Sequence, residues 1–471
     1  MLSIADRVWI NIRQVYTRVT LTRFTFAFFL LGFTHCFAQG IIQAFLFSVD
    51  DNAASFVSSI IQQANASSYQ REFAYLTRPN GEYHLSLCSH IPRGATQNPC
   101  QPVYPVGDSN MTEYSSVDLV GPDQTITTIM DPTDVVSIAG SNSSGVILMK
   151  VDGTEVILSQ TCVMTLVYPS QVINNSRRED LALLISQFWL FSISYFGLMH
   201  DSIPHILAAI STRVLATGWS AYSIWRTTNI KERFQHLIID TETPCHRQLF
   251  PTYFSTRISF QIPDLVLNVT ALVFSSYLAW HLVKDYASHS FKRVGPPAAI
   301  VRIYGFFLAV FVCMQLLVFF LSAAMGLWVD QLFNGDIARI SSHTTIYEGL
   351  FLFTTIILIP WLTMGWYSVR LEKKSLMAGF LSLAFTLIVC WAVMFYSLVY
   401  RWTFIQWPFF ACMTVSSFIV LIACFGFGVI CWLNFNKGLK HWLYVEDVLA
   451  KSDFEPEVFP HDVEKVPFPG Y

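Results

Sequence analysis

The feature that most constrains this chain is the way one long polar stretch interrupts its apolar ones. One apolar stretch lies near 24–49, and about seven more lie between 181 and 433. A helix that crosses the hydrocarbon core of a bilayer needs about 20 mostly apolar residues. The pattern therefore predicts a mainly α-helical integral membrane protein, with one N-terminal span followed by a seven-helix bundle.

We expect eight spans, near residues 24–48, 181–199, 203–225, 259–283, 301–327, 346–369, 375–399 and 409–433. The third is the least secure, because it contains Arg213 and a charge is costly at mid-bilayer. Only 13% of the residues are charged, against about 25% in soluble domains. With a net charge of −3, the chain has no excess of basic residues of the kind that nucleic-acid-binding proteins carry. The bilayer itself is therefore the first expected partner.

The polar stretch, residues 50–180, has the features of an extracellular or lumenal domain. It carries four Asn-x-Ser/Thr glycosylation acceptors, at Asn65, Asn110, Asn142 and Asn174. Such acceptors are modified only on that side of the membrane. Short runs rich in β-branched residues, such as 146–158 and 160–168, predict a β-rich fold. Asp152-Gly153 predicts a two-residue type I′ hairpin turn.

Lys and Arg in short loops favour the cytoplasm. With eight spans, the basic clusters of residues 7–23, 284–302, 370–374 and 437–440 fall on one side, opposite the 50–180 domain. Both termini are then cytoplasmic: residues 1–23, and a tail at 434–471 that begins as an amphipathic helix and continues acidic and Pro-rich. The loop 226–257 disagrees, because it would lie outside yet holds five Lys or Arg residues. The protein is expected in the plasma membrane or a secretory-pathway membrane.

The first apolar segment has two interpretations. Cys36-Phe37-Ala38 after an apolar run could be a signal-peptide cleavage site. An uncleaved anchor is favoured because the preceding basic region is long and apolar residues resume at 41–49. Cleavage would leave seven spans and an outside N-terminus.

Four of the ten cysteines lie outside the bilayer in this topology: Cys88, Cys100, Cys162 and Cys245. An even number on the oxidising side predicts two disulfides. Cys88 with Cys100 is the local choice, which leaves Cys162 to join the outer domain to the loop that bears Cys245, although four cysteines allow three pairings. We find no Cys/His cluster with zinc spacing, so neither a metal nor a cofactor is expected.

Ionisable residues within spans are candidates for function. Asp264 and Asn268 are four apart and share a helix face, and Arg213 could pair with Asp264. We hypothesise that these residues and Glu348 line a polar cavity that opens outward. The alternative is one interhelical pair that locks the bundle. The sequence has no phosphate-binding Gly-rich loop, HExxH or GxSxG motif, so an enzyme is not expected.

Several stretches in the C-terminal half carry a resemblance: Ser220–Arg226, Ile262–Val269, Ser290–Gly295, Arg302–Tyr304, Trp328–Leu332, Arg401–Phe404 and Asn434–Gly438. Through them the chain resembles an uncharacterised family of fungal, chiefly basidiomycete, multi-pass membrane proteins of seven-transmembrane type. That resemblance implies a loose association with development or host infection. The layout is also similar to that of Wntless-type cargo receptors, without shared motifs, and a layout does not imply a function.

These observations favour a receptor-like or cargo-receptor-like protein that binds a protein or small-molecule ligand outside the cell or in the lumen. The alternative is a transporter or channel that uses the intramembrane polar residues. A water path to the inner turn at His200–His205 would favour transport, whereas a bundle sealed at mid-depth under a grooved outer domain would favour binding.

Overall fold

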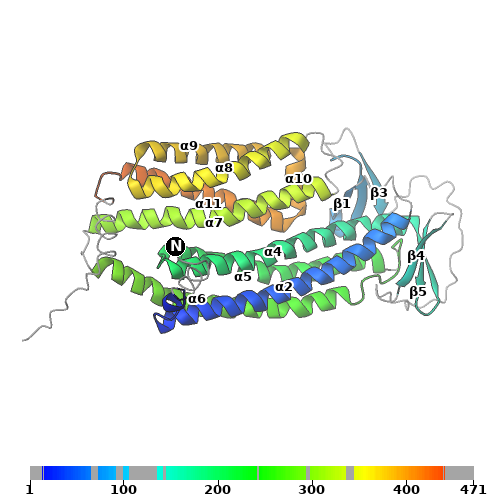
Figure 1. Cartoon of the computed structure of the whole chain (residues 1–471). Coiled ribbons are helices and arrows are strands. Elements are labelled where there is room, and N and C mark those ends of the chain that lie inside the picture. Colours follow the sequence, from blue (N-terminus) through cyan, green and yellow to red (C-terminus); the bar gives the residue numbers. More distant parts are fainter. Residues whose placement is uncertain are drawn as a thin grey trace, which may run out of the picture.

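The computed structural model describes residues 13, 15–64, 73–91, 99–104, 135–141, 145–240, 243–292, 298–335, 344–438 and 440. Long, roughly parallel helices make up most of this part of the chain, and the strands gather at one end of them (Figure 1). We call this the strand end.

The helices form two groups. The first group holds α2 (Arg23–Gln63), α4 (Val167–Met199), α5 (Ile203–Phe234) and α6 (Tyr253–Lys292). Within it, α2 packs against α4 and α6, and α5 packs against α4 and α6. The capping box between Thr22 and Thr25 starts α2, because the two side chains satisfy backbone N–H groups that the first helical turn leaves free.

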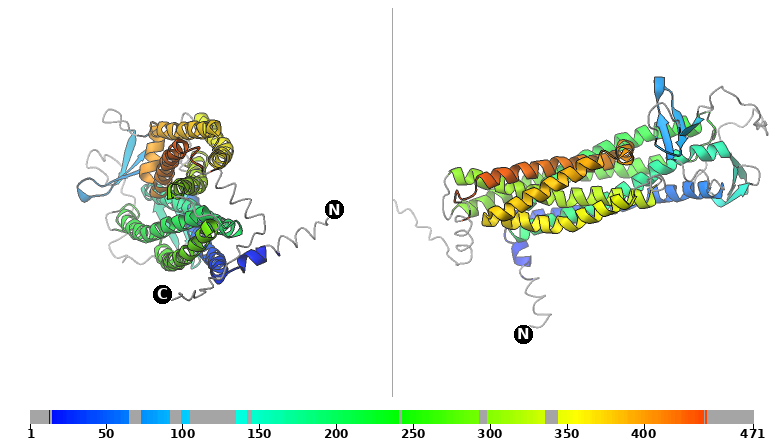
Figure 2. Two further views of the ribbon diagram at one scale, coloured as in Figure 1. Left: turned by 90° about the vertical axis from the view of Figure 1, so that its left-hand side faces the viewer. Right: turned by 90° about the horizontal axis from the view of Figure 1, so that it is seen from above.

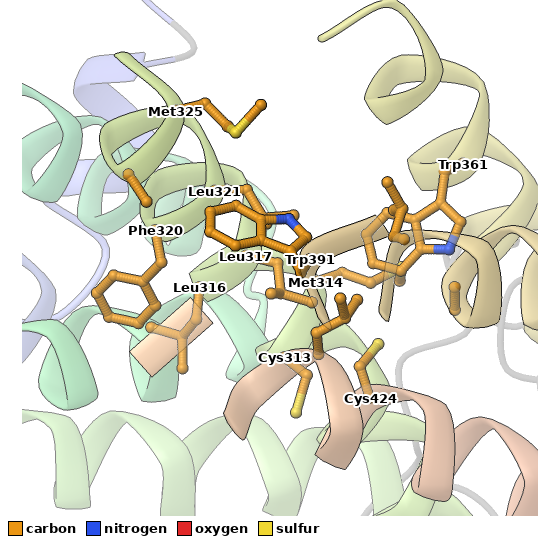
Figure 3. Close-up of a cluster of buried hydrophobic side chains, with 14 of the residues drawn as sticks. Cys313, Met314, Leu316, Leu317, Phe320, Leu321, Met325, Trp361, Trp391 and Cys424 are labelled. Atoms are coloured by element: carbon orange, nitrogen blue, oxygen red, sulfur yellow. The ribbon is translucent and has the colours of Figure 1, made fainter. Parts of the chain in front are cut away.

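The second group holds α7 (Ala298–Asn334), α8 (Thr344–Leu371), α9 (Lys374–Met394), the short α10 (Leu398–Gln406) and α11 (Pro408–Leu433). Seen end-on, these helices, coloured yellow-green (α7) to red (α11), lie together, beside the green helices of the first group (Figure 2). Their core is apolar and aromatic: Trp391 and Trp361 face the side chains of α7, together with Cys424 (Figure 3). Contacts of α7 with α4 and α5 join the two groups.

Seven helices of the described chain are long and apolar enough to cross a membrane: Arg23–Gln63, Gln160–Met199, Tyr253–Tyr286, Ile300–Asn334, Gly349–Leu371, Lys374–Met394 and Pro408–Leu433. The chain is thus a mainly helical, multi-pass membrane protein, as its hydropathy predicts. Among the helices at the eight expected spans, α5 does not meet this criterion of length and hydropathy, because it contains Arg213 and many Ser and Thr residues. It nevertheless runs the length of the bundle between its neighbours (Figure 1).

The strands form two separate three-stranded antiparallel sheets. The first sheet consists of β1 (Phe73–Thr77), β2 (His84–Cys88) and β3 (Cys100–Tyr104), with a 3-10 turn at Pro79–Gly81 between β1 and β2. The second consists of β4 (Val135–Ser141), β5 (Gly145–Lys150) and β6 (Glu155–Ser159).

Both sheets contribute to one hydrophobic core with the helix ends. Leu85 and Leu87 of the first sheet and Val146 and Leu148 of the second are buried in the same cluster as Ile60 of α2. The start of α6 and the π-helical turn η4 (Gln235–Ile239) complete this cluster. The strand end is therefore built jointly by sheets and helices, which explains why α2 continues to Gln63 and α4 begins at Val167, both well beyond the expected spans.

Two local predictions were wrong. Residues 160–168 form α3 (Gln160–Thr165) and the first residues of α4 instead of a strand. Ser159 caps α3, since its hydroxyl accepts the Cys162 N–H, and the helix is buried on the shared core. The hairpin between β5 and β6 has a three-residue loop: Gly153 N–H donates to the Lys150 carbonyl at 3.0 Å, and Gly153 is the loop residue with positive φ. A type I′ turn needs two such residues.

The predicted disulfides are both present. Cys88 is bonded to Cys100, across neighbouring strands β2 and β3. Cys162 of α3 is bonded to Cys245, in the segment between η4 and α6. The second bond thus joins the two sequence regions that enclose the shared core.

Candidate functional site

The glycosylation acceptors fall mostly outside the described residues. This applies to Asn65, Asn110 and Asn142. Asn174 lies within α4, half-buried, and its Nδ2 donates to Ser170 Oγ at 3.4 Å. It is part of the first turns of α4 at the strand end, and its modification stays a prediction.

Asp264 is the centre of a buried polar cluster among α2, α5 and α6. Its Oδ1 accepts hydrogen bonds from the side-chain amides of Gln39 and Gln43, the latter at 2.5 Å. Its Oδ2 accepts from the Ser220 hydroxyl and, at 3.3 Å, from Asn268 Nδ2. All five side chains are at most 6% exposed. The carboxylate is therefore held by four neutral donors.

Arg213 does not join this cluster. Its Nη1 lies 3.2 Å from His35 Nδ1, and no ion pair of Arg213 occurs among the residues that the structure describes. Arg213 precedes Ser220 by seven residues, which is about 10 Å along a helix. The expected Arg213–Asp264 pair is therefore wrong: two turns of α5 separate Arg213 from the residue that contacts Asp264, and its guanidinium contacts His35 of α2 instead.

Glu348, the fourth residue of the hypothesised cavity, belongs to α8 in the other helix group, and its side chain lies outside the described part. The structure brings Asp264 and Asn268 together and leaves Arg213 apart. Sequence reasoning missed the residues of α2. His35, Gln39 and Gln43 are spaced by four in an apolar helix, and such a stripe indicates a polar interhelical face.

A second network of buried charges lies closer to the strand end. Arg257 of α6 forms ion pairs with Asp50 of α2 and with Asp180 of α4, the latter at 3.4 Å. The Tyr253 hydroxyl donates to Asp50 Oδ1 at 2.9 Å. These four side chains tie three helices of the first group together at one level.

The network continues on α4 and α5. Glu179, 1% exposed, accepts from Arg226 Nη2 at 2.7 Å and from Trp219 Nε1 at 2.8 Å. Arg226 and Arg257 are two of the five cations whose position contradicted the charge bias. Both are neutralised inside the protein, so they carry little information about the side of the membrane.

A small polar cavity of about 20 Å³ lies between the Asp264 cluster and the network of buried charges around Arg257 and Glu179. It is lined by residues of α2, α4, α5 and α6: Gln43, Leu46, Glu179, Asp180, Leu183, Gln187, Ala216, Trp219, Ser220, Ser223, Arg257, Gln261, Asp264 and Asn268. Towards the end opposite the strands, an apolar cluster around Phe28, Leu198, Ile206 and Leu282 fills the space among the same four helices. Apolar side chains of the described residues thus pack together on that side of the cavity.

Two further hollows meet near the strand end, at Arg178. The first, which we call the outer pocket, has a volume of about 70 Å³ and lies among β1, α4, α7 and α10, with lining residues that include Gln171, Asn175, Gln331 and Trp402. Phe73 of β1 packs edge-on against Trp402, at 5.2 Å between ring centroids. The pocket therefore contacts both helix groups and the first sheet.

The second hollow, the lateral groove, measures about 510 Å³ and lies among α2, α4 and α7. Its wall is apolar, with residues such as Phe47, Ile185, Phe319 and Leu327. Arg178 lines both hollows. Its guanidinium is paired with Asp330 and donates to Gln331 Oε1 at 2.6 Å. A polar pocket and an apolar groove that meet at one arginine can hold the two parts of an amphiphilic molecule.

The described residues contain no group of three or more His, Cys, Asp or Glu side chains placed to hold a metal ion. At the turn between α4 and α5, His205 Nδ1 is hydrogen-bonded to Ser202 Oγ at 2.7 Å. Compared with protein-family models, curated proteins and solved structures, the chain matches none of them. The fold and its buried polar sites define the class, a multi-pass helical membrane protein.

Proposed function

We propose that this chain is a non-enzymatic, receptor-like or cargo-receptor-like membrane protein that binds an amphiphilic ligand on its outer side. The observation that carries this proposal is the junction at Arg178 between the outer pocket and the lateral groove. A polar part of the ligand would lie in the pocket beneath the first sheet, and an apolar part would lie in the groove. A protein with an apolar attachment and a small lipid-like molecule both fit this description.

The proposal includes eight passes, with the sheets outside and both termini in the cytoplasm. The basic clusters follow or precede helix ends that lie opposite the strands (Figure 1), as the charge bias of a cytoplasmic face requires. α2 is one continuous helix from Arg23 to Gln63. Cleavage near Ala38 would remove His35 from its contact with Arg213, which supports an uncleaved anchor.

An apolar cluster at one end of the polar cavity favours binding over transport. The apolar cluster around Phe28, Leu198 and Ile206 separates the cavity from the inner turn. A transport path through the first helix group would have to open this cluster. A receptor needs no such opening.

The decisive experiment is a substitution that places a larger side chain in the lateral groove. Gly326 of α7 lines it, and a Cβ atom at this position would meet nothing within 4 Å. Gly326→Leu therefore adds a side chain inside the groove without a backbone clash. Gly305→Leu is the matched control, because it has the same open surroundings on the same helix, outside both hollows.

Native mass spectrometry of the full-length protein, purified in mild detergent from its own cells, would detect a retained ligand as a discrete added mass. We expect that mass on the wild type and on Gly305→Leu, with at least about tenfold lower occupancy on Gly326→Leu. Equal occupancy of all three proteins would refute the groove as the site.

A further inference from the structure

Three glutamines that line the polar cavity each have a buried amide oxygen without a hydrogen-bond partner. These oxygens are the Oε1 atoms of Gln43, Gln187 and Gln261, and each residue is 3% exposed. A buried acceptor normally has a partner, because water is no longer available to it. Three such atoms around one small cavity indicate that the cavity favours a positively charged or hydrogen-donating occupant.

The orientation of the Gln43 amide follows from its surroundings. Its Nε2 donates to Asp264 Oδ1 at 2.5 Å. The opposite orientation would place the amide oxygen against the carboxylate, two acceptors in contact. Gln43 Oε1 must therefore point away from Asp264, and it has no hydrogen-bond partner in the structure.

The charges around the cavity do not balance. Glu179, Asp180 and Asp264 line it, and Arg257 is the cation among the lining residues. Their direct partners add one carboxylate, Asp50, and one guanidinium, Arg226. Four carboxylates thus face two guanidinium groups in a buried space, where uncompensated charge is unfavourable.

We propose that this cavity binds one monovalent metal cation of the size of Na⁺. Hard cations take oxygen ligands, and Gln43, Gln187 and Gln261 offer three neutral oxygens close to the negative charge of Asp264. A cavity of about 20 Å³ has room for about one water-sized particle. Among the described residues no three acidic, His or Cys side chains converge, which disfavours a divalent ion. The site is separate from the outer pocket and the lateral groove, and the proposal does not depend on the proposed function.

The test measures thermal unfolding of the full-length protein in lipid nanodiscs. NaCl is replaced stepwise by choline chloride at constant ionic strength, so that screening does not change. A bound ion stabilises the folded state by RT ln(1 + c/Kd), where c is the Na⁺ concentration, and we expect the midpoint to rise by about 4 °C when the Na⁺ concentration is well above Kd. Direct binding of radioactive sodium should saturate at one ion per chain.

Two variants remove ligands. Gln261→Met removes an oxygen without a hydrogen bond in the structure, so it should fold and lose most of the sodium response. Asp264→Asn should abolish the response. Thr354→Val is the control, because it changes a buried polar side chain of α8 that lies outside the cavity, the outer pocket and the lateral groove, and it should leave the sodium response intact.

Three results would overturn the proposal. One is a wild-type midpoint that does not depend on Na⁺. Another is stabilisation by Ca²⁺ in the absence of any sodium effect. The third is a sodium response that Gln261→Met and Asp264→Asn both retain. If acidic pH alone stabilises the protein and sodium does not, protons neutralise the cavity and the proposed ion site does not exist.

Discussion

Arg226 of α5 donates its Nη2 proton to Glu179 Oε2 of α4 across 2.7 Å, and both side chains are largely buried. Trp219 contacts both partners. Its Nε1 donates to the Glu179 carboxylate, and the centroid of its ring lies 5.5 Å from the Arg226 guanidinium carbon. The pair joins α4 to α5 at the level of the Arg257 network.

Removing one partner of this pair should be more harmful than removing both. Arg226→Leu leaves Glu179 buried without its counter-charge, which costs about 3–5 kcal/mol. The double variant Glu179→Gln/Arg226→Leu should recover a substantial part of that loss. Chemical unfolding of the detergent-solubilised protein measures both values.

The matched control is Arg177→Leu. Arg177 pairs with Asp51 at 2.9 Å, but the side chains are 34% and 49% exposed. Water screens such a pair, and we expect a loss of less than about 1 kcal/mol. Equal losses for Arg226→Leu and Arg177→Leu would contradict the importance assigned to burial.

The Cys162–Cys245 disulfide should contribute more stability than the Cys88–Cys100 disulfide. The two bonds join residues 83 and 12 positions apart. By loop-closure entropy this corresponds to about 4.5 and about 3 kcal/mol. Thermal midpoints of the two double Cys→Ala variants test the order, and a larger loss for the Cys88/Cys100 variant would contradict it.

The β5–β6 hairpin should weaken in acid. Hydrogen bonds from the Thr154 hydroxyl and N–H hold the pKa of Asp152 below its ordinary value of 3.8. Because the folded-state pKa is lowered, the stabilisation is complete above the unfolded-state pKa and is lost as the pH falls through the folded-state value. The hydrogen-exchange protection factor of the Thr154 amide should fall in this range.

Asp152→Asn is the control for that measurement. Asparagine keeps an acceptor oxygen but has no proton to gain in this pH range. The protection factor of the variant should therefore show no such decrease. A decrease of the same size in the variant would assign the effect to another group.

The membrane-spanning helices and the disulfides could be predicted from the sequence, because both depend on local features: a long apolar run, and cysteines that lie outside such runs. The last span, expected at 409–433, coincides with α11 at Pro408–Leu433, since a run of apolar residues forms a helix in lipid whatever its neighbours are. The Cys162–Cys245 bond belonged to one of three possible pairings, which was preferred because Cys88 with Cys100 is the local pair.

Contacts that depend on helix rotation could not be predicted in this way. Which group faces Asp264 depends on the relative rotation of α2, α5 and α6, and no single helix contains that information. The segment at 160–165 is rich in β-branched residues, yet Ser159 caps it and the shared core covers it, so packing outweighs its β propensity.

Two glycines in the second helix group should respond oppositely to alanine. A Cβ on Gly365 of α8 would lie 2.5 Å from Met314 Sδ and 2.7 Å from the Phe380 ring. That ring stacks on Trp361 at 5.1 Å and is fully buried, so it has little room to move. Gly365→Ala should therefore destabilise the protein by about 1–3 kcal/mol through overpacking.

Gly305→Ala on α7 is the matched substitution, because a Cβ there meets nothing within 4 Å. Without a clash, alanine should be neutral or stabilise the helix by up to about 1 kcal/mol. Thermal unfolding in nanodiscs gives both values. Equal destabilisation by the two substitutions would show that α8 does not pack against α7 and α9 as closely as the short distances at Gly365 require.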